Sequence, residues 1–180
     1  MASGTRANRA DKLIEQISTN YNNTLVVQEV GQAVSSVLDI DKLLHLISNV
    51  LETRLPFDRG MIMLVNPGRS KLVYACGYGA SQELELTLRK AFFHLDNPLS
   101  RGPFIKAFRE QTPVFVNDIK DMMGDISARS KNLMESLGAE SFICVPIVFN
   151  GISEGILAVD NHKSRKSLNQ SQVNILSAIA

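Results

Sequence analysis

The stretch SFICVPIVFNGISEGILAVDN, residues 141–161, decides the fold of this chain. Two apolar runs flank Asn150-Gly151, a pair that tolerates the positive φ angles of a type I′ hairpin turn. The run before the turn is apolar on both faces, and the run after it, Gly155 to Val159, is nearly so. Such strands lie in the middle of a sheet that is covered on both sides. The sequence therefore predicts a central β-hairpin, for which the rest of the chain must supply two covers.

The remaining strands and helices are predicted from the spacing of apolar residues and from Gly, Pro and Asn breaks. Strands are expected at residues 59–66, 71–79, 92–95 and 114–116. Helices are expected at residues 8–38 and 40–55, in short segments from Ser81 and from Pro103, at 127–137, and after Asn169. Residues 118–128 are expected to form a loop. Tight turns between neighbouring strands indicate an antiparallel sheet, with the helices divided over its two faces.

Helix ends carry their own signals. Asp39 or Asp41 is expected to cap the helix at 40–55, and Gly138 to end the helix at 127–137. Asn169, with Gln172 three positions later, resembles a capping box. The last helix still has helical spacing where the sequence stops, which we interpret as a chain cut from a longer protein.

The helix at residues 8–38 has a short heptad-like seam formed by Val26, Val30, Ala33 and Val37. A helix with such a stripe ahead of a domain either packs back on that domain or pairs with a second copy. The sequence analysis favours pairing.

Charge, hydropathy and cysteine content argue against several classes of protein. The net charge of +1 provides no field that would recruit nucleic acid or an anionic membrane. No apolar run approaches the roughly 20 residues of a membrane span, and the polar N-terminus lacks a secretory signal. Cys76 and Cys144 both lie in apolar runs, which indicates buried, reduced thiols in a cytoplasmic protein.

Four segments in order resemble the GAF domain family: residues 38–66, 77–81, 112–119 and 141–161. The resemblance implies an α+β fold, layered α/β/α, with a six-stranded antiparallel sheet. Terminal helices would cover one face and make a homodimer, and short helices and loops would close a ligand pocket on the other. It also implies a division into a signalling and dimerisation helix at residues 1–37 and a GAF domain at 38–180.

The family's pocket geometry implies a set of candidate ligand-binding residues. From the sheet these are Met63, Cys76, Phe142 and Cys144, and from the loops they are Phe93, His94, Leu99, Phe104, Phe115, Asn117, Asp118 and Arg129. An apolar cavity with a few polar groups is the general form of a small-molecule site. Asp118 and Arg129 are the preferred polar groups, although Asp118 also fits a turn or cap residue and Arg129 a solvated helix residue.

Relatives that bind cyclic nucleotides carry an Asn-Lys…Phe…Asp-Glu motif after the last strand. Here Asn161 matches, Lys163 is shifted by one position, Leu168 replaces the Phe, and Gln172-Val173 replaces the acidic pair. The broken motif argues against a cyclic nucleotide without excluding it.

Other cofactors have weaker signals. Bilin-carrying relatives place a Cys-His pair where this chain has Arg129-Ser130, so covalent bilin attachment is not expected. His94 is the candidate axial ligand for haem, but a strand-end hydrogen bond is the preferred interpretation. No phosphate-binding glycine loop, HExxH or CxxC motif occurs. The cofactor is therefore unknown, and no metal is expected.

One branch of the family reduces free methionine sulfoxide with closely spaced cysteines around the pocket. Such chemistry needs an attacking and a resolving thiol, and the two cysteines here lie on separate strands. We therefore expect no enzymatic activity in this chain. The prediction is a sensory domain of a bacterial multidomain protein that regulates an output domain, with a histidine kinase as first choice and a nucleotide cyclase as second. The alternative is a ligand-free dimerisation or interaction module with a self-filled pocket.

Overall fold

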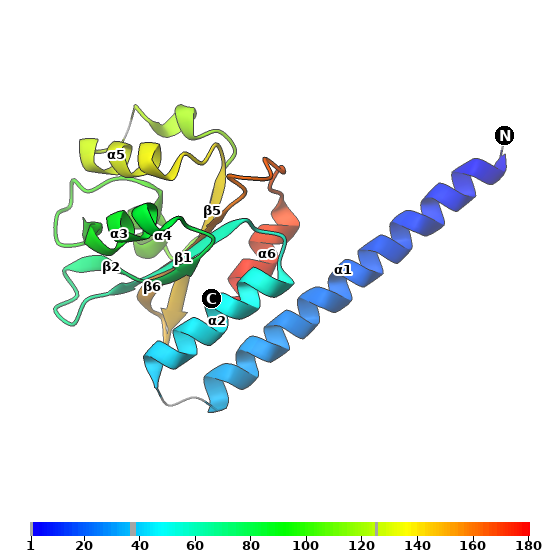
Figure 1. Cartoon of the computed structure of the whole chain (residues 1–180), viewed down its shortest axis with the longest axis horizontal. Helices are drawn as coiled ribbons and strands as arrows, with labels where there is room; N and C mark the ends of the chain where they lie inside the picture. Colours follow the sequence, from blue (N-terminus) through cyan, green and yellow to red (C-terminus); the bar gives the residue numbers. More distant parts are fainter. Residues whose placement is uncertain (1, 37–38, 125) are drawn as a thin grey trace.

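A six-stranded antiparallel sheet with the order β3-β2-β1-β6-β5-β4 lies at the centre of the molecule. The computed structural model describes residues 2–36, 39–124 and 126–180. Helices cover both faces of the sheet, as Figure 1 shows. The α+β fold and the six-stranded antiparallel sheet predicted from the sequence are thus confirmed.

The element order also follows the prediction. The strands are β1 (Arg59–Val65), β2 (Lys71–Tyr78), β3 (Phe92–His94), β4 (Val114–Val116), β5 (Phe142–Phe149) and β6 (Ile152–Asp160). The helices are α1 (Ala2–Ser36), α2 (Ile40–Arg54), α3 (Gln82–Lys90), α4 (Pro103–Glu110), α5 (Ala128–Leu137) and α6 (Gln170–Ile179). A 3₁₀-helix, η1 (Ile119–Met122), lies in the segment expected to be a loop. Val37 and Leu38 of the first predicted helix lie outside the described residues.

Local signals account for several turns and helix ends. Asn150 and Gly151 have φ angles of 50° and 76°, as the hairpin turn requires. The Asp39 side chain caps α2, and Asn169 and Gln172 form the expected capping box on α6. Gly138 ends α5 in the left-handed conformation. These confirmed signals fix where the covering helices begin and end.

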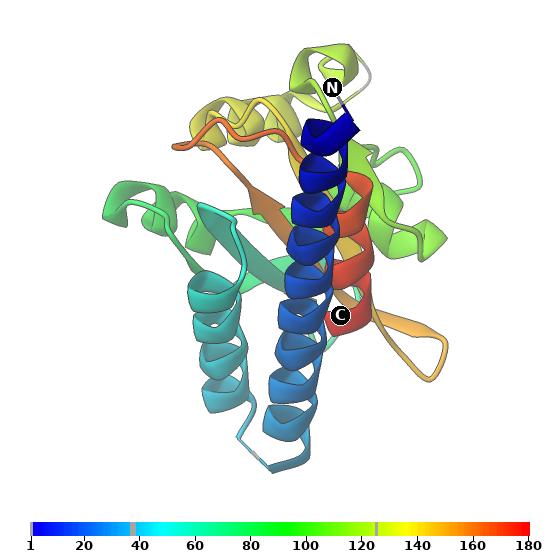
Figure 2. The ribbon, with the colours of Figure 1, turned by 90° about the vertical axis from the view of Figure 1, so that its right-hand side faces the viewer.

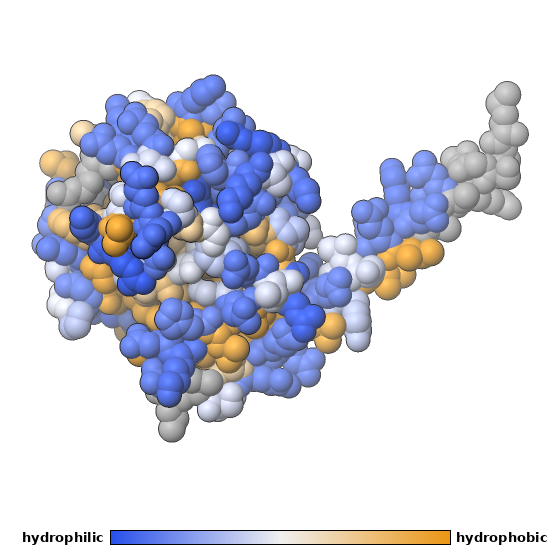
Figure 3. Space-filling view, viewed as in Figure 1, coloured by the Kyte–Doolittle hydropathy of each residue, from blue (hydrophilic) through white to orange (hydrophobic). Residues whose placement is uncertain are grey.

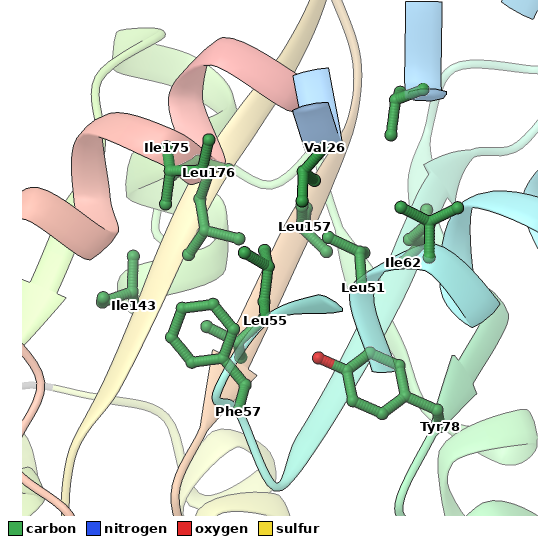
Figure 4. Close-up of a cluster of buried hydrophobic side chains, with 14 of the residues drawn as sticks. Val26, Leu51, Leu55, Phe57, Ile62, Tyr78, Ile143, Leu157, Ile175 and Leu176 are labelled. Atoms are coloured by element: carbon green, nitrogen blue, oxygen red, sulfur yellow. The ribbon is translucent and has the colours of Figure 1, made fainter. Parts of the chain in front are cut away.

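The helix face of the sheet, as we call it, is covered by α1, α2 and α6, which lie side by side in Figure 2. Its core consists of aliphatic and aromatic side chains from these helices and from alternate strand positions, and Figure 4 labels ten of them: Val26, Leu51, Leu55, Phe57, Ile62, Tyr78, Ile143, Leu157, Ile175 and Leu176. Because Val26 and Val30 belong to this core and Ala33 is also buried, the seam of α1 packs back on its own domain. The preference for pairing through this seam is therefore wrong; Val37 lies outside the described residues.

The N-terminal part of α1 extends beyond the domain (Figure 1). It carries a stripe of large exposed side chains: Leu13, Ile14, Ile17 and Tyr21. Figure 3 shows orange side chains along this protruding segment. Among the helices of the described residues, none combines the length and the apolar character needed to cross a membrane.

The cover face, as we call the opposite side, carries the short helices α3, α4 and α5 (Figure 1). Its core is rich in Met and Phe, with buried side chains that include Met61, Met63, Leu88, Phe93, Phe104, Leu133, Met134 and Phe142. Met122 and Met123 pack against its margin. This is the face on which the sequence analysis places a ligand pocket.

Candidate functional site

A small cavity of about 20 Å³ lies between the sheet and the short helices of the cover face. Its apolar lining comes from β1, α3, α4, α5, β5 and β6 and includes Met61, Leu88, Phe104, Leu137, Phe142 and Ala158. Arg59 and Asp160 supply the charged part of the lining. A cavity of this volume holds about one water molecule. In this conformation the chain's own side chains therefore leave almost no room at this place.

Arg59 and Asp160 form a buried ion pair at the wall of the cavity. Nε and Nη2 of Arg59 both donate to Oδ2 of Asp160, at 2.9 and 2.7 Å. The two side chains are only 8% and 9% exposed. Nη2 of Arg59 also donates to the carbonyl oxygen of Leu137 at 2.8 Å. The pair thus joins the sheet to the C-terminal end of α5.

Strand register brings the two charges together. Arg59 is the first residue of β1 and Asp160 the last of β6, and the two are opposite each other in the antiparallel ladder. Oδ1 of Asp160 accepts from the backbone N–H of His162 at 3.0 Å, and Nδ1 of His162 lies 2.7 Å from the carbonyl oxygen of Gly138. Burial raises the pKa of the Asp160 carboxyl, while Arg59 and the His162 N–H oppose that shift. Through their contacts with the carbonyl oxygens of Leu137 and Gly138, Arg59 and His162 both hold the C-terminal end of α5.

Five of the predicted ligand-binding residues lie in the core of the cover face: Met63, Phe93, Phe104, Phe142 and Cys144. The Phe104 ring contacts Phe93 and Phe142, with ring centroids 5.2 and 5.8 Å apart. Phe104 and Phe142 line the cavity itself. Complete burial raises the pKa of the Cys144 thiol, which keeps it protonated and unreactive. Whether these residues bind a ligand stays a prediction.

Cys76 does not lie on the cover face, which corrects its predicted place in the pocket. It packs in the core of the helix face, where its Sγ lies 3.2 Å from Oγ of Ser48. The cause is a bulge in β2: Ile62 is paired with Cys76, but the next residue, Met63, is paired with Tyr74. One extra residue in a strand turns the following side chains to the other face. The two cysteines are therefore on opposite sides of the sheet.

Phe115 was also predicted to line the pocket, and it too faces the other way. It is the middle residue of β4 and packs against the core of the helix face. Its neighbours Val114 and Val116 pack on the cover face instead. The alternation of side chains along a strand explains this arrangement.

Asn117 and Asp118 do not line the cavity. Asn117 and Asp118 are exposed, and Oδ1 of Asp118 accepts from the backbone N–H of Lys120, 2.9 Å away. Asp118 thus caps η1, which is the alternative role considered for it. The Arg129 side chain lies outside the described residues, although its backbone belongs to α5.

His94 and Leu99 border a second, more open hollow of about 220 Å³. His94 is partly exposed, with Nδ1 lying 3.3 Å from Oδ1 of Asp96, and Leu99 is 77% exposed. These two positions suit the rim of a site rather than its interior. Within the described residues, no group of three His, Cys, Asp or Glu side chains is arranged to hold a metal ion.

Arg59 and Asp160, the two charged residues of the cavity wall, were not among the predicted site residues. A usable signal was present, because each is a charged residue at the end of an apolar strand run. A charged side chain at such a place is rarely buried unless it is paired. Placing β1 beside β6 would have identified the pair, but the sequence shows no signal for that neighbour relation.

Comparisons with known proteins agree with this fold. A family model described as a GAF domain matches residues 37–180. Among curated proteins, no sequence is similar enough to count as a match.

Solved structures resemble the whole fold. A methyl-accepting chemotaxis protein superposes with a TM-score of 0.68 at 24% identity, covering 86% of this chain and 89% of that one. The GAF domain of a phosphoenolpyruvate-protein phosphotransferase from Coxiella burnetii gives 0.68 at 15%, covering 88% and 89%. Free methionine-R-sulfoxide reductase from Neisseria meningitidis, in complex with its substrate, gives 0.63 at 21%, covering 87% and 83%. At these identities the likeness concerns the fold alone.

Proposed function

The chain belongs to the GAF domain family, and from that premise we propose that it is a sensory module for a small molecule. The ligand binds on the cover face, between the sheet and the helices α3, α4 and α5. Its binding changes the arrangement of α1, α2 and α6 on the helix face. A ligand acts in this way when it contacts one arrangement of the cover better than another.

The observation that carries this proposal is the position of the Arg59–Asp160 pair between the cavity and the terminal helices. Arg59 follows α2 after the short link 55–58, and Asp160 precedes α6 across residues 161–169. Hydrogen bonds fasten these two links together: the Asp58 N–H donates to Oδ1 of Asn161 at 3.2 Å, and the Ser164 N–H donates to Asp58. A shift of the ion pair is therefore passed to the starting point of α6 and the end of α2.

Native mass spectrometry of the chain incubated with a metabolite extract tests the proposal. We expect a non-covalent adduct of small mass and a raised melting temperature, because a ligand that binds only the native state stabilises it. Ala158→Leu, which fills the cavity, is expected to abolish the adduct. Ala178→Leu makes the same change at an exposed position of α6 and serves as the control. An adduct that survives Ala158→Leu contradicts the proposed location.

We also propose that the chain is not an enzyme. The reductase among its structural neighbours was solved with its substrate, and thiol-based reduction needs a second thiol that resolves the first. Here Cys76 and Cys144 lie on opposite faces of the sheet. The absence of free methionine sulfoxide turnover by the purified chain in the presence of a dithiol would support this part of the proposal.

A second candidate function, a ligand-free interaction module, is favoured by one observation. The contacting rings of Phe93, Phe104 and Phe142 pack at the proposed site, where the cavity measures only about 20 Å³. Under this alternative, Ala158→Leu stabilises the chain and no adduct forms with any extract. The native mass experiment therefore separates the two functions.

A homodimer is the proposed assembly, with a second copy of α1 covering the exposed stripe. Val26 follows Ile17 by about two and a half helical turns, so the stripe faces away from the side of α1 that packs on the domain. The stripe leads toward a groove between α1 and α6 that Thr24 and Gln28 help to line. A helix with no tertiary contacts is marginal in water, which supports a partner for the protruding segment.

Sedimentation of the full chain tests this assembly. The double variant Leu13→Glu and Ile17→Glu is expected to shift the chain to monomer, because it puts charges into the apolar stripe. Gln16→Glu with Thr19→Glu adds the same charge to the other side of the same segment and is expected to leave the dimer intact. A wild-type monomer at all concentrations contradicts the proposal.

The proposal extends to the output and the compartment. An output domain of histidine kinase type is the first choice and a nucleotide cyclase the second, and the chemotaxis protein among the structural neighbours supports a role in bacterial signalling. Two buried, unpaired cysteines support a cytoplasmic location.

A further inference from the structure

The Arg59 guanidinium has one donor group that its ion pair does not use. Nε and Nη2 are bonded to Asp160 and Leu137, whereas Nη1 makes no hydrogen bond with any of the described residues. Nη1 is not fully buried. In the described part of the chain, Oη of Tyr78 is the one side-chain nitrogen or oxygen that is fully buried without a hydrogen-bond partner. Arg59 lines the cavity, and Nη1 is the nitrogen of its guanidinium that is left to donate to a molecule that enters there.

The charges around this donor decide what it can bind. Arg59 and Asp160 cancel each other, and the carbonyl oxygens of Leu137 and Gly138 bring the negative end of the α5 dipole to the same place. A second carboxylate here would lie beside the first in an apolar surrounding, where like charges repel strongly. A neutral acceptor oxygen avoids that repulsion and still gains a charge-assisted hydrogen bond.

The rest of the cavity wall is apolar, so it favours a ligand that has a hydrocarbon part to bury against it. The present volume of about 20 Å³ admits no such group, which means that a cover element has to move. Helix α5 suits this movement, because Leu133, Met134 and Leu137 hold it by apolar packing and its C-terminal end is anchored by Arg59 and His162. The anchored end can stay in place while the rest of the helix rises.

From these features we propose that the cavity below α5 selects a neutral, largely apolar molecule with a carbonyl oxygen, which accepts a hydrogen bond from Nη1 of Arg59. This inference rests on the proposed function and names the ligand class of that site. Arg59 then has two roles, since it anchors α5 through Nη2 and recognises the ligand through Nη1.

Benzamide, benzoate and toluene are the probes for this inference, because they share one ring and differ in charge and in the acceptor oxygen. Each is titrated into the full chain labelled with ¹³C in the methionine methyl groups. Met61 lines the cavity and is the expected reporter, while Met122 and Met123 at the margin of the cover face serve as internal references. We expect benzamide to shift the Met61 signal with an affinity at least about tenfold above those of benzoate and toluene.

Each result has a defined meaning. Equal affinity for toluene and benzamide overturns the role of Nη1, and equal or tighter binding of benzoate overturns the selection for a neutral ligand. In both cases the proposed function stands, because a small molecule still binds under the cover. No binding of any probe also overturns this inference, whereas the proposed function is then judged by the native mass experiment with its metabolite extract.

A variant sharpens the same test. Arg59→Lys keeps a positive charge beside Asp160 but removes the proposed donor, Nη1. We expect it to lose the roughly tenfold preference for benzamide while its affinity for toluene is unchanged. Arg69→Lys, at an exposed arginine paired with Glu154, is the matched control and is expected to keep the preference. A preserved preference in Arg59→Lys contradicts the proposal.

Discussion

The helix face and the cover face of the sheet differ in their helices and in the side chains of their cores. The helix face is covered by α1 with 35 residues, α2 with 15 and α6 with 10, and its core contains mainly branched aliphatic side chains. The cover face has helices of 8 to 10 residues. All five methionines of the described residues lie in or against its core: Met61, Met63, Met122, Met123 and Met134. It also contains the buried ion pair and the cavity.

This difference teaches where the molecule can change shape. Branched side chains have few rotamers, whereas methionine is flexible and fills irregular gaps. Short helices held by a few contacts open locally at a lower free energy than a packed core. We therefore expect the cover face to open while the helix face stays closed.

Breaking the buried ion pair is expected to have the largest effect. Arg59→Met leaves the Asp160 carboxylate buried without its partner, and the free energy of unfolding should fall by about 3–5 kcal/mol. The double variant Arg59→Met with Asp160→Leu removes both charges and should recover at least half of that loss. Urea unfolding measures both. A double variant as unstable as the single one contradicts this assignment of the cost to an unpaired charge.

Ile156 and Leu157 are neighbours on β6 and face opposite sides, which makes them a matched pair. Truncation of either to alanine should cost about 2–5 kcal/mol. We expect Leu157→Ala near the upper end of this range and Ile156→Ala near the lower end, because methionines on the cover face relax into the space. Urea unfolding of the two variants provides the numbers, and the reverse order would count against the contrast.

Two helix caps compare the faces at smaller cost. Asn169 caps α6 on the helix face, and Ser127 caps α5 on the cover face. Replacement of either by alanine should cost about 1 kcal/mol. For Asn169→Ala we expect a lower free energy of global unfolding. For Ser127→Ala we expect faster hydrogen exchange in α5 and little change in global unfolding, and a purely global loss in that variant would argue against local opening.

The smallest effect concerns the link between β1 and the loop before α6. Burial alone raises the pKa of Asp58, but hydrogen bonds from Ser164 and Lys163 outweigh it and hold the pKa below its usual value. Because the ionised form is favoured in the folded state, this stabilisation is present above the unfolded pKa and is lost as pH falls through the folded one. Wild type should therefore lose slightly more stability than Asp58→Asn as the pH falls from about 5 to about 3, the range that spans the ordinary pKa of an Asp carboxyl. Parallel curves from urea unfolding at each pH would remove Asp58 from the account.

Much of the fold was open to prediction because its signals are local. Asn150-Gly151 specifies the turn, Asn169 and Gln172 specify the start of α6, and apolar periodicity identifies each strand. Long-range relations lack such signals. The pairing of β1 with β6, which brings Arg59 to Asp160, is one of them.

Face assignment failed where a strand departs from simple alternation or was not examined residue by residue. The bulge in β2 places Cys76 on the helix face, and no residue type at that position predicts a bulge. Phe115 is different, because the alternation of side chains along β4 already predicts that it lies on the opposite face from Val114 and Val116. The seam of α1 was assigned to a partner because its true contact, the domain itself, comes later in the chain.

Thiol labelling in the native state shows which face of the sheet opens, because each face holds one buried cysteine. Cys144 on the cover face is 0% exposed and Cys76 on the helix face 4%, and burial raises the pKa of both thiols. Each reacts with iodoacetamide only when its face opens, and mass spectrometry of peptides measures the two rates separately. We expect Cys144 to be labelled at least about tenfold faster, although it is the more deeply buried, because local opening needs less free energy than global unfolding. Equal rates, or faster labelling of Cys76, would contradict the claim that the cover face is the one that opens.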